Sequence, residues 1–223
     1  MQHYPFKAGA GSSHQRLIRL IPRWAAKGGR FLDLGAFGGE VGAAVRSHFS
    51  HTTAVERDPE QMAPLATRYD AVLIADLDQV AHVPRGIGAI LLADVLEHLR
   101  APEDLLGLAA GNLADGGKIF ISIPNVANLA IRLHLLLGNF EYQDRGILDR
   151  THVRFFTRRT ARRLVESAGL RIVHEEVTPV PIREAFPRWP GLILRPLEMF
   201  VLALTPLWPT LLGYQFIFVA EKK

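Results

Sequence analysis

The stretch FLDLGAFGGE, residues 31–40, decides the expected fold. An apolar run carrying Asp33 is followed by glycines at 35, 38 and 39, which let the backbone pass close to a ligand. They also open a helix, whose N-terminal N–H groups favour anionic or polar groups. Nicotinamide cofactors call for G-x-G-x-x-G, whereas the spacing here is G-x-x-G-G with Phe37 inside the loop. A glycine loop alone is a weak signal for any one ligand, but this spacing disfavours a dinucleotide.

Short apolar runs alternate with helical patterns, beginning with the run that leads into this loop. Because each run is short and bounded by turn residues, we predict strands at 30–35, 51–56, 71–76, 87–94 and 117–124, with helices at 40–49, 59–68 and 102–113. Further along we predict an apolar helix at 126–138, a helix at 158–169 capped by Thr157, and strands at 170–177 and 214–221. The expected fold class is α/β: a doubly wound, mostly parallel seven-stranded sheet with helices on both faces, as in Rossmann-like proteins.

Length and composition fit one sizeable core. The chain has 223 residues, 48% of them hydrophobic, and we expect a single domain over 1–223. It has no cysteine and begins with a polar segment, so we expect a cytoplasmic protein. A net charge of +4 and a pI near 9.7 allow an anionic partner. We expect no nucleic-acid binding, because no basic stripe is interleaved with aromatic residues.

Two segments depart from the alternating pattern. Residues 125–157 form a substrate-side lid and loop, whose apolar helix is either core or a lid, with core preferred. Residues 180–223 form an apolar tail that ends in the last strand, and half of the fourteen prolines lie from Pro179 onward. Its run at 197–208 is shorter than the about 20 residues that span a bilayer. A buried or half-buried helix is the first interpretation; the second is peripheral contact of 188–208 with the inner membrane face.

Acidic residues end the second and third predicted strands, at the edge where ligands bind in such sheets. Glu56 lies 21 positions after Gly35 and could accept both ribose hydroxyls of an adenosine moiety. Asp76 could accept from an adenine amine. Each acid alone could equally be a solvated strand end or a helix cap. Together, on consecutive strand ends, they favour a nucleoside.

At this point the chain resembles the class I S-adenosylmethionine-dependent methyltransferases. The match is carried by LDLGAFGGE, AVERDPE, IADLD, LLADVLEHLRAPEDLL and LADGGKIFISIPN, and it runs from about residue 31 to 170. The second half is similar to methyltransferases of bacterial surface-polysaccharide clusters and, more distantly, to O-methyltransferases of ubiquinone synthesis. The family loop usually has a small residue where Phe37 stands. The resemblance implies S-adenosylmethionine as cofactor, S-adenosylhomocysteine as product, and cofactor contacts from Asp33, Gly35, Phe37, Gly39, Glu56, Arg57, Asp76, Leu77 and Asp94.

Two histidines are candidates for catalysis. A base near pH 7 must take a proton from the acceptor, which suits histidine. His152 is the first candidate, with Asp149 fixing its tautomer; its alternative is a structural histidine that holds the loop. His98 would close the pocket beside Asp94 and Glu97. These last three could imitate a metal site on one helical face, but we predict no metal.

Six arginines fall within residues 150–163. A solvated helix face is the plain interpretation. The sharper hypothesis is that Arg150 and Arg154, with Asn125, bind a small-molecule or glycan acceptor through a phosphate or carboxylate. The predicted function is methylation of a sugar or other small hydroxyl. The alternatives are a non-catalytic cofactor-binding or membrane-associated partner in glycan assembly, and a nicotinamide oxidoreductase.

Overall fold

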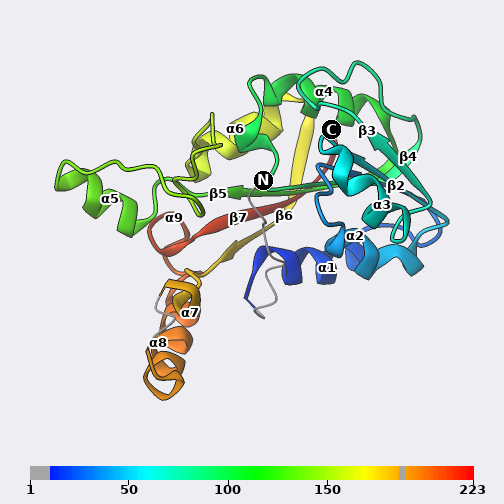
Figure 1. The fold of residues 1–223 in the computed structure, drawn as a ribbon. Coiled ribbons are helices and arrows are strands. Elements are labelled where there is room, and N and C mark those ends of the chain that lie inside the picture. Colours follow the sequence, from blue (N-terminus) through cyan, green and yellow to red (C-terminus); the bar gives the residue numbers. More distant parts are fainter. Residues whose placement is uncertain (1–10, 186–188) are drawn as a thin grey trace.

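A seven-stranded sheet organises the protein, whose structure is a computed structural model describing residues 11–185 and 189–223 (Figure 1). The strand order is β3-β2-β1-β4-β5-β7-β6. Strands β1 to β5 are parallel, and β7 runs antiparallel between β5 and β6. The predicted α/β class with a mostly parallel sheet is confirmed. The strands are β1 (Arg30–Leu34), β2 (His51–Glu56), β3 (Ala71–Ile74), β4 (Ile87–Ala93), β5 (Leu113–Pro124), β6 (Leu170–Thr178) and β7 (Gln215–Lys222).

Helices cover both faces of the sheet because side chains alternate along each strand. Phe31 packs on one face with α1 (Ser13–Trp24), α2 (Glu40–Val45) and α3 (Met62–Ala66), whereas Leu32 faces α4 (Pro102–Asn112) and α6 (Arg158–Ser167). Three 3₁₀ turns, η1 (Arg46–His48), η2 (Pro59–Gln61) and η3 (Leu96–His98), adjoin the helices and strand ends. The remaining helices are α5 (Leu129–Leu136), α7 (Ile182–Ala185), α8 (Gly191–Leu204) and α9 (Pro209–Leu212).

Most predicted elements are present, with shifted ends. Thr157 caps α6 as predicted, through a reciprocal hydrogen-bonded box with Thr160. Strand β5 begins at Leu113, four positions before the predicted strand. Helix α1 is not among the predicted elements, although Ser12 caps it and its buried residues recur at helical spacing.

The two apolar helices outside the sheet differ in burial. Helix α5 has no buried residue, and Leu136 is 81% exposed, so the preferred prediction of a core helix is wrong. In α8 Leu194 is buried, whereas Met199 and Phe200 are 69% and 61% exposed, so the helix is half-buried, as its first interpretation stated. Figure 1 shows both helices projecting from the sheet on the side away from β3. Within the described residues, no helix is both long and apolar enough to cross a bilayer.

Candidate active site

The strand order reverses between β1 and β4, and the carboxyl ends of these two strands form the expected ligand crevice. Phe37 follows β1 and Asp94 follows β4. Among the described residues, these are the two non-glycine residues with positive φ, at 46° and 56°. Such backbone costs free energy and clusters at functional sites. Both strained residues therefore mark the crevice that the topology predicts.

The glycine loop is built for close approach. Gly35 has φ +79°, and a Cβ added there would lie 2.6 Å from Cγ2 of Val95 and 3.7 Å from Cδ1 of Leu77. Gly39 has φ +76°, and its added Cβ would lie 2.7 Å from atoms of Leu65 and Tyr69. Any side chain at either position would both strain the backbone and collide. The loop thus lies directly against the segments that follow β3 and β4, where predicted cofactor residue Leu77 is found.

Glu56 ties the end of β2 to this loop. Its side chain is buried; Oε2 accepts from the Phe37 amide at 2.7 Å, and Oε1 accepts from the amides of Arg57 at 2.8 Å and Asp58 at 3.0 Å. A carboxylate offers about four acceptor positions, and three are used. One ribose hydroxyl can be accepted directly, and two require the Phe37 amide to release Oε2. The Glu56 carboxylate can therefore accept the hydroxyls of an adenosine ribose.

Asp33 lies beneath the loop. Its carboxyl is 3% exposed and accepts from the Tyr69 hydroxyl at 2.5 Å. Burial is the main reason that its pKa rises from 3.8 to about 7, and the nearby carboxylates of Glu56 and Glu40 add to it, whereas the Tyr69 hydrogen bond lowers it. The structure makes Asp33 a support for the loop, and its contact with the cofactor stays a prediction.

Asp94 and Asp76 are each held by neighbours. Asp94 Oδ1 accepts from Ser122 Oγ at 2.5 Å and from Gln215 Nε2 at 2.8 Å. Asp76 forms a turn, accepting from the amide of Asp78 at 3.0 Å. Both lie at the strand ends where cofactor contacts are predicted, and the exposed Arg57 follows Glu56 at the same edge.

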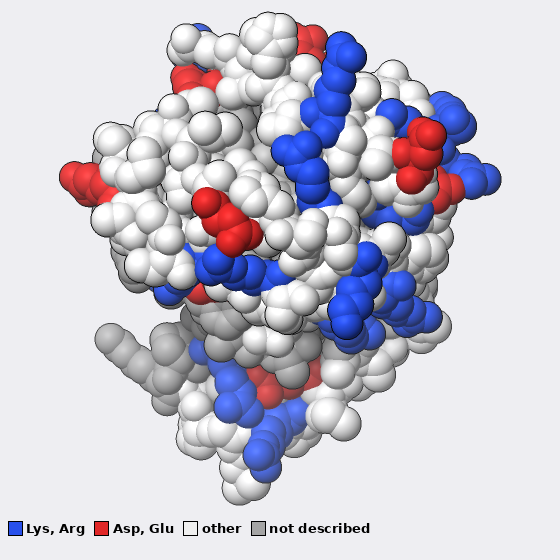
Figure 2. Space-filling view, turned by 90° about the vertical axis from the view of Figure 1, so that its right-hand side faces the viewer, with Lys and Arg blue, Asp and Glu red and all other residues white. Residues whose placement is uncertain are grey.

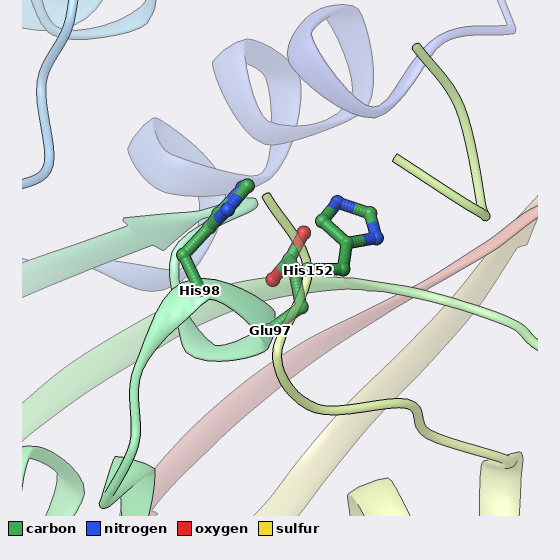
Figure 3. Close-up of side chains that lie close together, drawn as sticks. All are labelled: Glu97, His98 and His152. Carbon is green, nitrogen blue, oxygen red and sulfur yellow. The ribbon is translucent and has the colours of Figure 1, made fainter. Parts of the chain in front are cut away.

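Glu97, His98 and His152 come together in space (Figure 3). Glu97 and His98 belong to η3, and His152 belongs to the loop before α6. The candidate ligand atoms of the three side chains all lie within 4.8 Å of one another, and the two ring centroids are 4.8 Å apart. The Glu97 carbonyl oxygen accepts from the amide of Val153 at 2.9 Å, which joins the loop to η3. The structure thus replaces the considered group of Asp94, Glu97 and His98 with one containing His152.

Both imidazoles are arranged to accept a proton at Nε2. His152 Nδ1 lies 3.0 Å from the Ile147 carbonyl, and His98 Nδ1 lies 3.2 Å from the Thr151 carbonyl, so each Nδ1 is assigned the ring hydrogen. Burial lowers the pKa of both rings, and the neighbouring His98 lowers that of His152 further. Both are neutral near pH 7. Such a group can serve as a base or hold a divalent cation, and the predicted absence of a metal stays a prediction.

Asp149 does not have the predicted orienting role. It is fully buried, and its Oδ1 accepts from Thr151, through the amide at 2.8 Å and the hydroxyl at 2.6 Å. The Ile147 carbonyl sets the His152 tautomer instead. Asp149 thereby positions Thr151, which in turn contacts His98.

The predicted acceptor residues are dispersed. Asn125 is fully buried; its Nδ2 donates to the carbonyls of Thr210 and Gly213, both at 2.9 Å, and its Oδ1 accepts from the Ala127 amide. Both Nδ2 hydrogens are used within the protein and the side chain is buried, so the structure gives Asn125 a structural role, and its contact with an acceptor stays a prediction. Exposed Arg150 pairs with Asp144 at 3.1 Å, and exposed Arg154 donates to the Arg100 carbonyl. Acceptor binding by these two arginines stays a prediction.

Residues that sequence reasoning missed are those that support others. Tyr69 supports Asp33, Ser122 and Gln215 hold Asp94, and Thr151 contacts His98. Each comes from a distant part of the chain, so no local motif announces it. Thr151 is different, because it directly precedes the predicted residue His152 and its position in the sequence could have indicated it.

The sheet order, the glycine loop and the acids at the strand ends define an S-adenosylmethionine-dependent methyltransferase fold. The chain belongs to the methyltransferase domain family, whose model matches residues 8–175. S-adenosylmethionine is accordingly its cofactor, and the protein is an enzyme of the transferase class.

Relatives and solved structures agree with this assignment. The chain is 29% identical over 157 residues to a ubiquinone biosynthesis O-methyltransferase of Xylella fastidiosa, covering 67% of this chain and 63% of the relative. It therefore spans less than two thirds of that protein's length. It shares its fold with an S-adenosylmethionine-dependent methyltransferase of Archaeoglobus fulgidus (TM-score 0.62, 16% identity, 95% of each chain). A second one, from Mesorhizobium loti, has a TM-score of 0.63 at 16% identity and covers 96% of this chain and 100% of the other.

Proposed function

We propose that the protein methylates a hydroxyl oxygen of a small acceptor, with His152 as the general base. The observation that carries the proposal is the tautomer of His152. The Ile147 carbonyl accepts from its Nδ1, which leaves its Nε2 able to accept a proton. Alignment of two reactants contributes about 7–11 kcal/mol to barrier lowering, and a positioned base adds about 10²–10⁴-fold. When bound, the cofactor supplies an electrophilic methyl group. His152 takes the hydroxyl proton as the acceptor oxygen bonds to that methyl, and the carbon–sulfur electron pair stays on sulfur.

The acceptor class is proposed on two grounds. The Xylella relative is named for O-methylation, which supports oxygen as the methylated atom. The sugar or glycan acceptor and the polysaccharide context rest on the sequence resemblance, and the cytoplasmic location rests on the sequence composition. An anionic acceptor group would be bound by Arg150 and Arg154, which are exposed beside the His152 loop. On the face that Figure 2 shows, basic and acidic residues are interspersed, which favours a small acceptor over a nucleic acid.

Methyl transfer to a panel of acceptors tests the proposal. The panel contains nucleotide sugars, sugar phosphates and phenols, and S-adenosylhomocysteine is quantified after each reaction. His152→Ala should abolish turnover while cofactor binding persists. His51→Ala is the matched control, since His51 lies at the amino end of β2, opposite the site. Cofactor binding without turnover on any acceptor would favour the non-catalytic alternative.

Calorimetry tests the cofactor site separately. Wild-type protein should bind S-adenosylhomocysteine and not NAD, and Glu56→Ala should lose that binding because it removes the ribose acceptor. Glu60→Ala, four positions along and exposed, is the control. Unchanged affinity in Glu56→Ala would refute the ribose assignment, and preference for NAD would support the oxidoreductase alternative.

A further inference from the structure

Helix α5 projects without a packing partner among the described residues. None of its residues is buried, and Leu133 and Leu136 are 49% and 81% exposed. Leu137 and Phe140, which follow the helix, are 74% and 40% exposed. An isolated helix of this length is marginal in water, and a contiguous apolar patch marks an interaction surface.

The region of α8 is half-buried, and its outer face also exposes large apolar side chains. Leu192, Met199 and Phe200 are 85%, 69% and 61% exposed. Trp189 precedes the helix and Trp208 follows it, and they are 53% and 65% exposed. Tryptophan is enriched where protein meets the membrane–water interface, since its ring is apolar and its N–H is polar.

A basic cavity lies beside α5, α6 and α9. It has a volume of about 540 Å³ and is lined by Arg132 of α5, by the first turns of α6, and by Thr210 of α9, which follows α8. Arg158 and Arg162 there pair with Glu175, both at 2.6 Å. Arg132 and Arg159 form no ion pair among the described residues. The cavity therefore offers uncompensated positive charge beside α5.

We propose that α5 and α8 dock the protein on an anionic lipid bilayer, with their apolar side chains entering the headgroup region and the cavity arginines facing lipid phosphates. Figure 1 shows the helices as two separate projections on the side away from β3. A bilayer accepts two separate insertions, whereas a symmetric dimer needs one self-complementary patch. Apolar contact with flanking cations is the pattern of interfacial helices. The inference is independent of the acceptor and of His152.

Vesicle flotation of the full chain tests this docking. Vesicles of phosphatidylcholine alone are compared with vesicles that also contain phosphatidylglycerol. We expect binding to both, tighter with phosphatidylglycerol and weakened by salt. Leu136→Gln and Leu192→Gln should each lower the partition coefficient by about tenfold. Met62→Gln, at a 43% exposed position of α3, should leave it unchanged.

Three outcomes would overturn the proposal. The first is no flotation with either vesicle. The second is flotation that neither leucine variant alters. The third is a concentration-dependent dimer in sedimentation that the same variants disrupt, without vesicle binding, which would make a second copy the occupant. Arg159→Gln separates the electrostatic contribution from the apolar one, because it should reduce only the preference for phosphatidylglycerol.

Discussion

Replacing Asp33 by Asn should stabilise the protein at neutral and alkaline pH. Burial raises the pKa of Asp33 from 3.8 to about 7. Each pKa unit corresponds to about 1.36 kcal/mol, so this rise corresponds to about 4 kcal/mol. Asn is nearly isosteric and neutral at every pH, and its oxygen can still accept from Tyr69. The variant therefore removes the cost of ionising a buried carboxyl and keeps the hydrogen bond.

The pH dependence has a definite sign. The unfolded chain releases the Asp33 proton near pH 3.8, whereas the folded protein keeps it until about pH 7. Between these values unfolding releases a proton, so this carboxyl makes the folded state less stable as pH rises. Urea unfolding of both proteins, across that range, gives the difference in the free energy of unfolding. This difference should be near zero below pH 3.8 and grow to about 4 kcal/mol in favour of the Asp33→Asn variant above pH 7.

The matched control is Asp115→Asn, because Asp115 is an exposed carboxyl. Its difference from wild type should stay small at every pH. If the effect of Asp33→Asn were pH-independent too, or if the variant were less stable than wild type above pH 7, the pKa of Asp33 would not be raised, and its carboxyl would be ionised in the folded protein between pH 3.8 and 7 as well. The role of Asp33 as a buried, protonated support of the loop would then be wrong.

Three further predictions concern the site. Because burial lowers the pKa of His152, the acidic limb of the kcat profile should have its midpoint below 6.5; a midpoint above 6.5 would argue against His152 as the base. Gly35→Ala should destabilise the protein by about 2–4 kcal/mol in urea unfolding, through the positive φ and the collision with Val95, and a neutral effect would contradict the loop geometry. Dialysis against EDTA should leave methyl transfer unchanged, since no metal is predicted; lost activity that Mg²⁺ or Zn²⁺ restores would make Glu97, His98 and His152 a metal centre.

The sheet could be predicted because its signals are local. Each of the first five strands is a short apolar run, and the alternation with helices requires parallel pairing. Gly35 and Gly39 could be predicted for the same reason, since a loop that approaches another segment closely excludes a Cβ. The grouping of Glu97, His98 and His152 depends on how a distant loop folds over η3, and spacing along the chain carries no such information.

The wrong prediction for α5 has a physical cause. Apolar composition predicts that a helix avoids water, but it does not say whether protein or something else covers it. For α5 the preferred interpretation was the protein core, and the structure leaves this helix exposed. Asn125 is a different case: it follows β5 as predicted, but the segment before β7 accepts both of its Nδ2 hydrogens.

Strand β7 has a consequence for synthesis. It lies between β5 and β6, and its first residue, Gln215, holds Asp94 across 121 positions of sequence. During translation, β6 leaves the ribosome before the strand that separates it from β5. The nascent chain must therefore leave a strand-wide opening in its sheet, and the crevice beside β4 obtains its final support only after residues 215–222 have emerged. Ribosome-bound chains arrested before this strand would carry the glycine loop without a finished active site.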